Sequence, residues 1–162
     1  FETLREKAIL RLRAPLGRFV LREDSPRPIL FIAGGTGLAP IKGMIEHALH
    51  VGVTRPMHLY WGVRARRDLY LPDLPAAWER AHPEFRFVPV LSEPDPDWTG
   101  RTGLVHAAVV ADHPRLDAFD VYVAGPPPMI AAARVAFGEA GLPVDRLYSD
   151  AFEYAKDPPT AR

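Results

Sequence analysis

Three glycines follow a short apolar run in the segment Ile29-Leu30-Phe31-Ile32-Ala33-Gly34-Gly35-Thr36-Gly37. The run has the length of a β-strand, and a helix is expected to begin soon after the last glycine, at Pro40. Because glycine has no Cβ, a ligand can approach the backbone closely, and the free N–H groups of a helix start attract an anion. The segment therefore predicts a turn that binds a phosphate group.

A second strand-to-turn-to-helix pattern occurs at Val121-Tyr122-Val123-Ala124-Gly125-Pro126-Pro127-Pro128-Met129. If the two strands are neighbours in a parallel sheet, both turns flank the crevice in which such sheets bind nucleotides. Neither common phosphate motif fits, since Pro40 replaces the third glycine of the dinucleotide fingerprint and no Gly-Lys-Ser/Thr follows. A plain proline-capped helix with Met129 in the core stays open as an alternative.

Strand-like apolar runs alternate with segments of helical spacing along most of the chain. This alternation predicts an α/β fold with a doubly wound, five-stranded parallel sheet and helices on both faces. The predicted strands are Ile29–Ala33, Met57–Gly62, Phe85–Ser92, Asp120–Ala124 and Val144–Tyr148. The predicted helices are Pro40–His50, Leu74–Ala81, Gly103–Asp112 and Pro127–Ala140, the last one stopped by Gly141.

The beginning of the chain has a different pattern. Ala8–Arg13 and Arg18–Arg22 are predicted to be two short strands, and Glu23–Arg27 a polar linker. We therefore expect residues 1–24 to be the end of another unit and residues 25–162 to form the α/β domain.

The composition excludes several kinds of site. Twenty basic residues balance twenty acidic ones, so neither nucleic acid nor an anionic membrane surface is an expected partner. With no cysteine, the chain cannot hold a disulfide, a Cys-ligated zinc or an iron–sulfur cluster, and a redox role would need an organic cofactor. His47 and His50 share a predicted helix face without a third ligand, so no metal site is expected.

Four motifs, in this order along the chain, resemble the ferredoxin–NADP reductase superfamily. They are Pro15-Leu16-Gly17-x-Phe19, Gly34–Pro40, Asp68-Leu69-Tyr70, and Gly125-Pro126-Pro127 followed by Met129. Within the superfamily the chain is particularly similar to NADH-dependent reductase components of bacterial oxygenases and to CDP-6-deoxy-Δ3,4-glucoseen reductase. The resemblance implies a β-barrel that holds FAD and an α/β domain that holds the nicotinamide nucleotide.

Under this resemblance, residues 25–162 are the NAD-binding domain and Ala8–Leu21 the remnant of the FAD-binding β-barrel. FAD would be held mainly by barrel residues that precede Phe1. We therefore expect the chain by itself to bind NADH weakly and to lack NADH-dependent dye reduction.

The resemblance also implies roles for individual residues. Gly34, Gly35 and Gly37 would approach the pyrophosphate, and Thr36 would contact the nicotinamide end. Ala124, Gly125 and Pro126 would line the nicotinamide pocket, with Met129 packed beside the nucleotide. Ala124 replaces a cysteine that the family has near the point of hydride transfer. This difference leaves hydride transfer possible but puts its rate in question. Phe152 either faces the flavin ring or is a core aromatic; with Thr36 and Ala124 it completes the set of expected catalytic positions.

The choice of nucleotide depends on Ser92 and Glu93. NADPH-using relatives commonly have Arg after this serine, whereas Glu93 would repel a 2′-phosphate and accept from a free 2′-OH. Against this stand Arg64, Arg66 and Arg67, which either bind a phosphate or lie on a solvated loop. The sequence thus favours NADH over NADPH.

The sequence predicts the nucleotide-binding part of a cytoplasmic NAD(P)H-dependent flavin oxidoreductase. NADH would pass hydride to FAD, and the flavin would pass electrons to an iron–sulfur centre or an oxygenase-type acceptor. Two alternatives stay open: a non-catalytic α/β module that binds or senses a nucleotide, and a structural docking domain whose glycine turns are connectors.

Overall fold

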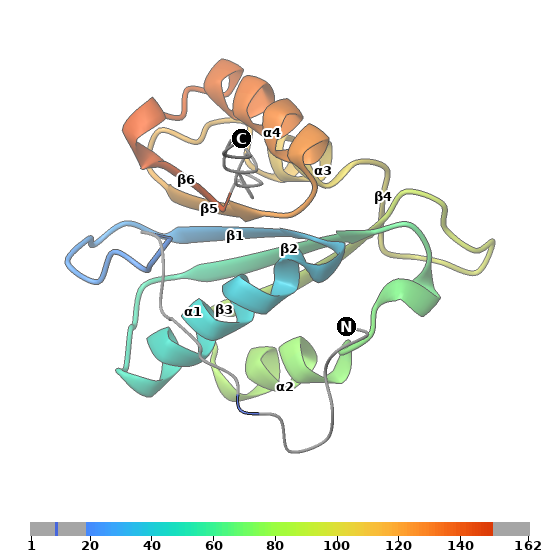
Figure 1. The fold of residues 1–162 in the computed structure, drawn as a ribbon, viewed down its shortest axis with the longest axis horizontal. Coiled ribbons are helices and arrows are strands. Elements are labelled where there is room, and N and C mark those ends of the chain that lie inside the picture. Colours follow the sequence, from blue (N-terminus) through green and yellow to red (C-terminus); the bar gives the residue numbers. More distant parts are fainter. Residues whose placement is uncertain (1–8, 10–18, 151–162) are drawn as a thin grey trace.

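Strand β1 (Ile29–Gly34) is buried along its whole length and lies inside a parallel sheet (Figure 1). The structure is a computed structural model that describes residue 9 and residues 19–150. β1 pairs with β2 (Met57–Val63) on one side and with β5 (Asp120–Ala124) on the other. Both β1 and β5 have nearly continuous apolar sequences, which suit strands covered on both faces.

The sheet has the order β4-β3-β2-β1-β5-β6, and all its pairs are parallel. The outer strands are β3 (Phe85–Leu91), β4 (Arg101–Thr102) and β6 (Leu147–Asp150). The chain winds outward from β1 to β4 and then returns to the far side of β1 as β5. The winding direction therefore reverses between β1 and β5, which confirms the predicted doubly wound α/β class.

Two helices cover each face of the sheet, as Figure 1 shows. They are α1 (Leu38–His50), α2 (Asp73–Ala81), α3 (Val105–Asp112) and α4 (Pro127–Glu139). Phe31 and Ala33 pack on the side of α1 and α2, called the α1 face below. Leu30 and Ile32 pack on the side of α3 and α4, called the α3 face. Successive residues of β1 thus serve two separate cores.

The strands differ from the prediction in two places. The sheet has six strands rather than five, because β4 is a strand of two exposed residues with no apolar pattern. The segment predicted as the strand Val144–Tyr148 begins with a 3-10 turn, η3 (Val144–Arg146), and only then enters β6. Val144 is 84% exposed, so its apolar side chain is not evidence of a buried strand.

The helices begin at positions that backbone hydrogen bonds explain. A 3-10 turn, η1 (Gly35–Gly37), leads into α1, which starts at Leu38 rather than Pro40. Pro40 still fits, because the first N–H groups of a helix have no intrahelical acceptor. α3 starts at Val105 rather than Gly103, because Gly103 has a φ of +92°, outside the right-handed helical region, and its N–H donates to the Leu91 carbonyl (2.8 Å).

Residues 19–22 belong to no strand, so the predicted strand Arg18–Arg22 is wrong for its described part. Leu21 is buried in the α1-face core, and the Arg22 N–H donates to the Tyr122 hydroxyl (2.9 Å). Burial raises the pKa of Tyr122 to about 12, so this hydroxyl stays protonated at neutral pH. Apart from Ile9, the predicted strand Ala8–Arg13 lies outside the described residues.

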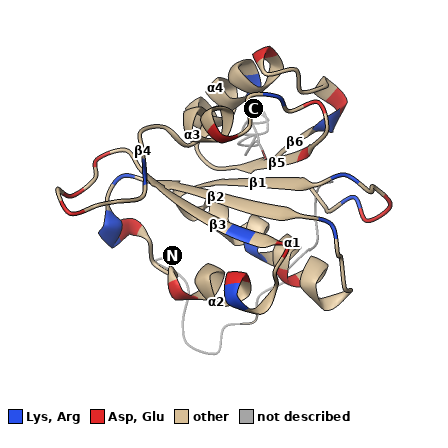
Figure 2. Cartoon of the chain, turned by 180° about the vertical axis from the view of Figure 1, so that it is seen from behind, with Lys and Arg blue, Asp and Glu red and all other residues tan. Residues whose placement is uncertain are grey.

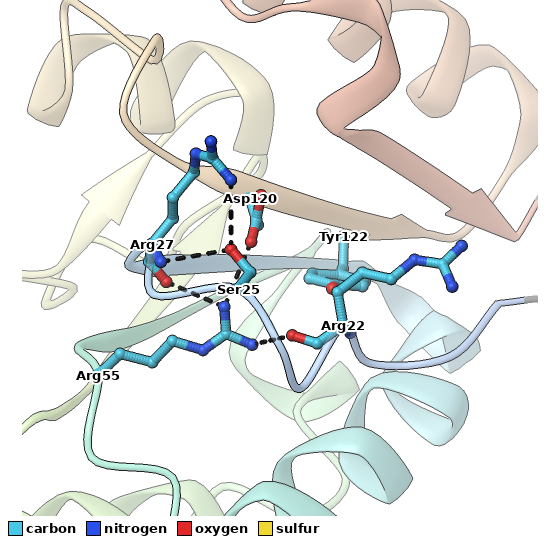
Figure 3. Close-up of polar contacts among 6 residues, drawn as sticks. All are labelled: Arg22, Ser25, Arg27, Arg55, Asp120 and Tyr122. Atoms are coloured by element: carbon cyan, nitrogen blue, oxygen red, sulfur yellow. Dashed lines mark hydrogen bonds and ion pairs between the residues drawn. The ribbon is translucent and has the colours of Figure 1, made fainter.

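Arg55 and Asp120 form a buried ion pair beside residues 22–27, the segment that precedes β1 (Figure 3). The Arg55 Nη1 lies 3.2 Å from Asp120 Oδ2 and also donates to the Arg27 carbonyl (3.1 Å), while Nη2 donates to the Arg22 carbonyl. The Arg55 and Asp120 side chains are 7% and 1% exposed. This buried pair sits at the amino end of β5, the sheet edge opposite the glycine turns.

Figure 2 shows that charged residues of both signs are interspersed along loops and helices. None of the helices in the described part of the chain is long and apolar enough to cross a bilayer.

Candidate functional site

The two glycine turns predicted from the sequence touch each other at the carboxyl ends of β1 and β5. A Cβ added to Gly37 would lie 2.1 Å from the carbonyl oxygen of Ala124, and one added to Gly34 would lie 2.4 Å from the Met129 Sδ. Both distances are far below van der Waals contact. The absence of side chains at these glycines therefore lets the two turns pack together where the winding of the sheet reverses.

A cavity of about 580 Å³ opens beside these turns on the α3 face. Its walls come from the ends of β1 and β2 and from the first turns of α3 and α4. The volume falls in the range of roughly 300–1,000 Å³ that is typical of small-molecule sites. Five of the residues predicted to bind the cofactor line it: Gly34, Gly35, Ser92, Pro126 and Met129.

The backbone at Gly35 is open to the cavity. Gly35 has a φ of +52°, which L side chains rarely adopt, and an added Cβ would meet no atom within 4 Å. Its carbonyl oxygen accepts the N–H of Leu38 and the indole N–H of Trp61 (3.0 Å). The turn is thus held by hydrogen bonds on one side and free of protein atoms on the other.

The other predicted residues lie around the cavity rather than in its wall. Thr36 and Glu93 are exposed, and Gly37 and Gly125 are buried where the two turns meet. Phe152 lies outside the described residues.

The structure places Ala124 and Gly37 differently from the expectation of direct ligand contact. The Ala124 side chain has no exposed surface and packs with Ala33 and Tyr122 in the α1-face core. Side chains alternate along a strand, so Val123 and not Ala124 points toward the cavity side. Gly37 faces the backbone of β5 rather than open space. These two residues therefore pack where the two turns meet, and their side-chain positions do not face the cavity.

The arginines near the mouth of the cavity are paired with carboxylates. Arg64, which lines the cavity, approaches Glu93 Oε1 through Nη2 (3.0 Å) and Nε (3.1 Å), and both side chains are largely exposed. Arg66 pairs with Asp97 (3.3 Å) and lies over the ring of Trp98 (5.4 Å to the centroid). Two of the three basic residues that could have held a phosphate therefore have acidic partners.

His106 lines the cavity but did not stand out in the sequence. Its Nδ1 is buried and has no hydrogen-bond partner among the described residues, and burial lowers its pKa. The neutral ring can donate or accept a hydrogen bond to a ligand. The sequence could not show that His106 lines the cavity, because Leu104-Val105-His106 alone has the pattern of an ordinary helix start. Its position follows from how the start of α3 packs against β2. Within the described ranges, no cluster of three or more His, Cys, Asp or Glu could hold a metal ion.

A protein-family model described as the oxidoreductase NAD-binding domain matches residues 31–135, which include both glycine turns and most of the cavity. The chain belongs to this family. The NAD-binding domain is the nucleotide-holding part of ferredoxin–NADP reductase-like proteins, so the resemblance predicted from the motifs is confirmed.

Two relatives match this NAD-binding domain over nearly all of its length. The CDP-6-deoxy-L-threo-D-glycero-4-hexulose-3-dehydrase reductase of Yersinia pestis is 44% identical over 96% of the chain and 47% of its own length. Protein RfbI of Salmonella typhimurium is 43% identical over 94% of the chain and 46% of its own length. The chain thus spans about half the length of these relatives.

A solved structure supports the same assignment. The reductase GcoB of Amycolatopsis superposes with a TM-score of 0.80 and 39% identity, covering 86% of the NAD-binding domain chain and 42% of GcoB.

Proposed function

We propose that this NAD-binding domain holds NADH as the nucleotide half of a flavoprotein reductase. The observation that carries the proposal is the cavity at the carboxyl ends of β1 and β2, bordered by the open Gly35 turn and by the Pro126 turn. It lies beside the point where the sheet reverses its winding, the place where open α/β sheets bind nucleotides.

The residues around the cavity fit such a ligand. The Gly35 backbone offers room for a pyrophosphate, since no protein atom lies within 4 Å of an added Cβ. His106 lines the cavity, where its ring can donate or accept a hydrogen bond to a bound ribose or base. Pro126 and Met129 form an apolar wall that would orient a flat ring and exclude water.

FAD belongs, in this proposal, to a β-barrel whose end is represented by residues 1–24, with Phe152 facing the flavin ring. When both groups are bound, the nicotinamide supplies a hydride and the flavin accepts it. The task of this chain is to bind and orient the nucleotide. Thr36, which is exposed at the turn, would contact its nicotinamide end.

NADH is the proposed nucleotide because the cavity mouth carries Glu93. A 2′-phosphate placed near Ser92 would meet the Glu93 carboxylate. Glu93 Oε1 is already paired with Nη2 of Arg64 at 3.0 Å. Binding NADPH would require breaking this pair or holding a second anion beside it.

The proposed acceptor of the electrons is a separate cytoplasmic protein, an oxygenase-type enzyme or a protein with an iron–sulfur centre. GcoB, described as a cytochrome P450 reductase, supports an oxygenase-type acceptor, and the Yersinia relative, named as the reductase of a dehydrase, supports a separate enzyme as the acceptor.

A titration of this chain with NADH, followed by amide NMR, tests the proposal. We expect saturable binding that shifts the signals of residues 34–37 and 125–129 together, and competition by ADP-ribose. With added FAD, the chain should reduce an acceptor dye no faster than background.

Two results would count against the reductase role. Shifts confined to the first turn, or equal binding of unrelated nucleotides, would favour a non-catalytic nucleotide sensor. Absence of any nucleotide binding would favour a structural docking domain.

A further inference from the structure

Trp61 makes a polar contact that an apolar core residue in β2 would not make. Its side chain has no exposed surface and packs in the α1-face core with Leu38 and Ile41. Even so, its indole Nε1–H donates to the carbonyl oxygen of Gly35 over 3.0 Å. The ring of Tyr70 packs edge-on against the indole, with centroids 5.0 Å apart. The indole is therefore fixed in place from both sides.

The register of the sheet explains why Trp61 reaches this carbonyl. Trp61 pairs with Ala33, and Gly62 pairs with Gly34, so Trp61 lies level with the end of β1. The chain leaves β1 at Gly34 and turns at Gly35, where φ is +52°. The indole thus lies beneath the turn, on the sheet face opposite the cavity.

The Gly35 carbonyl accepts two hydrogen bonds, one from the Trp61 indole and one from the Leu38 N–H. Together they fix the plane of the peptide that joins Gly35 to Thr36. In a trans peptide, the C=O and N–H groups point in opposite directions. With the carbonyl aimed at Trp61 on the α1 face, the Thr36 N–H points away from it, toward the side of the sheet that carries the cavity.

We propose that Trp61 is a positioning residue for nucleotide binding: it holds the Gly35–Thr36 peptide so that the Thr36 N–H faces the pyrophosphate. The inference rests on the proposed function, because it needs a phosphate-bearing ligand in the cavity. Trp61 does not touch that ligand; it acts through the Gly35 carbonyl. Phenylalanine at this position would fill most of the space but could not hold the peptide plane.

The variant Trp61→Phe tests the role of the indole N–H. We expect NADH and ADP-ribose to bind about three- to tenfold more weakly, the effect of one hydrogen bond of typical strength, with adenosine binding unchanged. The matched control is Trp78→Phe, since Trp78 packs edge-on with Phe85 (5.7 Å) and does not line the cavity. Thermal unfolding of both variants shows how much each substitution disturbs the core.

The outcomes separate this inference from the proposed function. Wild-type chain that binds no NADH would overturn both. Wild-type binding with unchanged affinity in Trp61→Phe, or an equal loss in Trp78→Phe, would overturn the positioning role alone. If Trp61→Phe does not fold, NMR of the wild type decides: we expect ADP-ribose to shift the Thr36 amide strongly while the Trp61 indole N–H stays protected from exchange. An unshifted Thr36 amide would refute the inference.

Discussion

Gly37 packs so closely against Ala124 that a Cβ on the glycine would lie 2.1 Å from the alanine carbonyl oxygen and 2.7 Å from the Gly125 nitrogen. These are backbone atoms of a central strand and its turn, and neither can move without disturbing the sheet. Gly37→Ala should therefore lower the free energy of unfolding by about 3 kcal/mol, the upper part of the range for overpacking a core. Urea denaturation followed by circular dichroism measures this loss.

Gly43 provides the control for this prediction. It lies in α1, and an added Cβ would meet no atom within 4 Å. Because alanine has less conformational freedom to lose in a helix, Gly43→Ala should stabilise the domain by about 0.5–1 kcal/mol. A Gly37→Ala protein as stable as the wild type would show that the contact between the turns is looser than described.

The buried pair of Arg55 and Asp120 should matter for stability far more than the exposed ion pairs. Asp120→Asn would leave the Arg55 guanidinium buried without a charged partner, as well as the Nε that already has no hydrogen-bond acceptor. We expect a loss of about 3 kcal/mol in unfolding free energy, because removing one member of a buried ion pair leaves the other charge buried without compensation. Urea denaturation of Asp120→Asn, Arg55→Met and the double variant measures the coupling.

The exposed pair of Arg115 and Asp117 (3.0 Å) is the control for the buried one. Solvent screens such pairs, so Asp117→Asn should leave the unfolding curve unchanged within error. If the double variant of Arg55 and Asp120 lost the sum of the two single losses, the residues would not act as a pair.

Two partly buried histidines that contact each other should make the stability of the domain depend on pH. Nδ1 of His58 lies 3.3 Å from Nε2 of His113. Burial lowers the pKa of both rings, and nearby His113 and Arg86 lower that of His58 further. The unfolded chain, with a histidine pKa near 6.5, therefore takes up protons before the folded one does. Stability should be complete above pH 6.5 and fall as the pH drops below it.

Urea denaturation at pH 7.5 and at pH 5.5 measures this slope. His113→Gln should flatten it, whereas His50→Gln, at an exposed position at the end of α1, should leave it unchanged. A slope as steep in His113→Gln as in the wild type would assign the effect to other groups, such as His106, whose pKa burial also lowers.

The sequence was sufficient to predict features that depend on local pattern. The apolar run of β1 and the glycines after it predicted both the central strand and the turn, since strand length and glycine content are local properties. β4 was missed because its two exposed residues owe their pairing to Val90 and Leu91 of β3.

Long-range contacts were the part that the sequence could not provide. The hydrogen bond from Trp61 to Gly35 joins residues 26 apart, and the position of His106 depends on how α3 docks on β2. The orientation of Ala124 could have been predicted from the sequence, because side chains alternate along β5 and Ala124 therefore lies on the same face as the aromatic Tyr122.

The last prediction concerns the nucleotide. Glu93 pairs with Arg64 at the cavity mouth, where a 2′-phosphate would come close to Ser92. Replacing Glu93 with glutamine removes the repulsion and releases Arg64, so NADPH should bind more tightly while NADH binding changes little. We expect the preference for NADH over NADPH to fall about three- to tenfold, the effect of roughly one exposed charge interaction acting on a doubly charged phosphate.

Isothermal titration of the two nucleotides into wild type and Glu93→Gln measures this preference. Arg64→Gln is the paired variant and should have the opposite effect, weakening NADPH because the cation that could accept the phosphate is gone while Glu93 still repels it. Both effects should shrink in high salt, since Arg64 and Glu93 are 77% and 60% exposed and solvent ions screen them. If Glu93→Gln kept the wild-type ratio of the two affinities, the discrimination would have to come from the shape of the cavity and not from its charge.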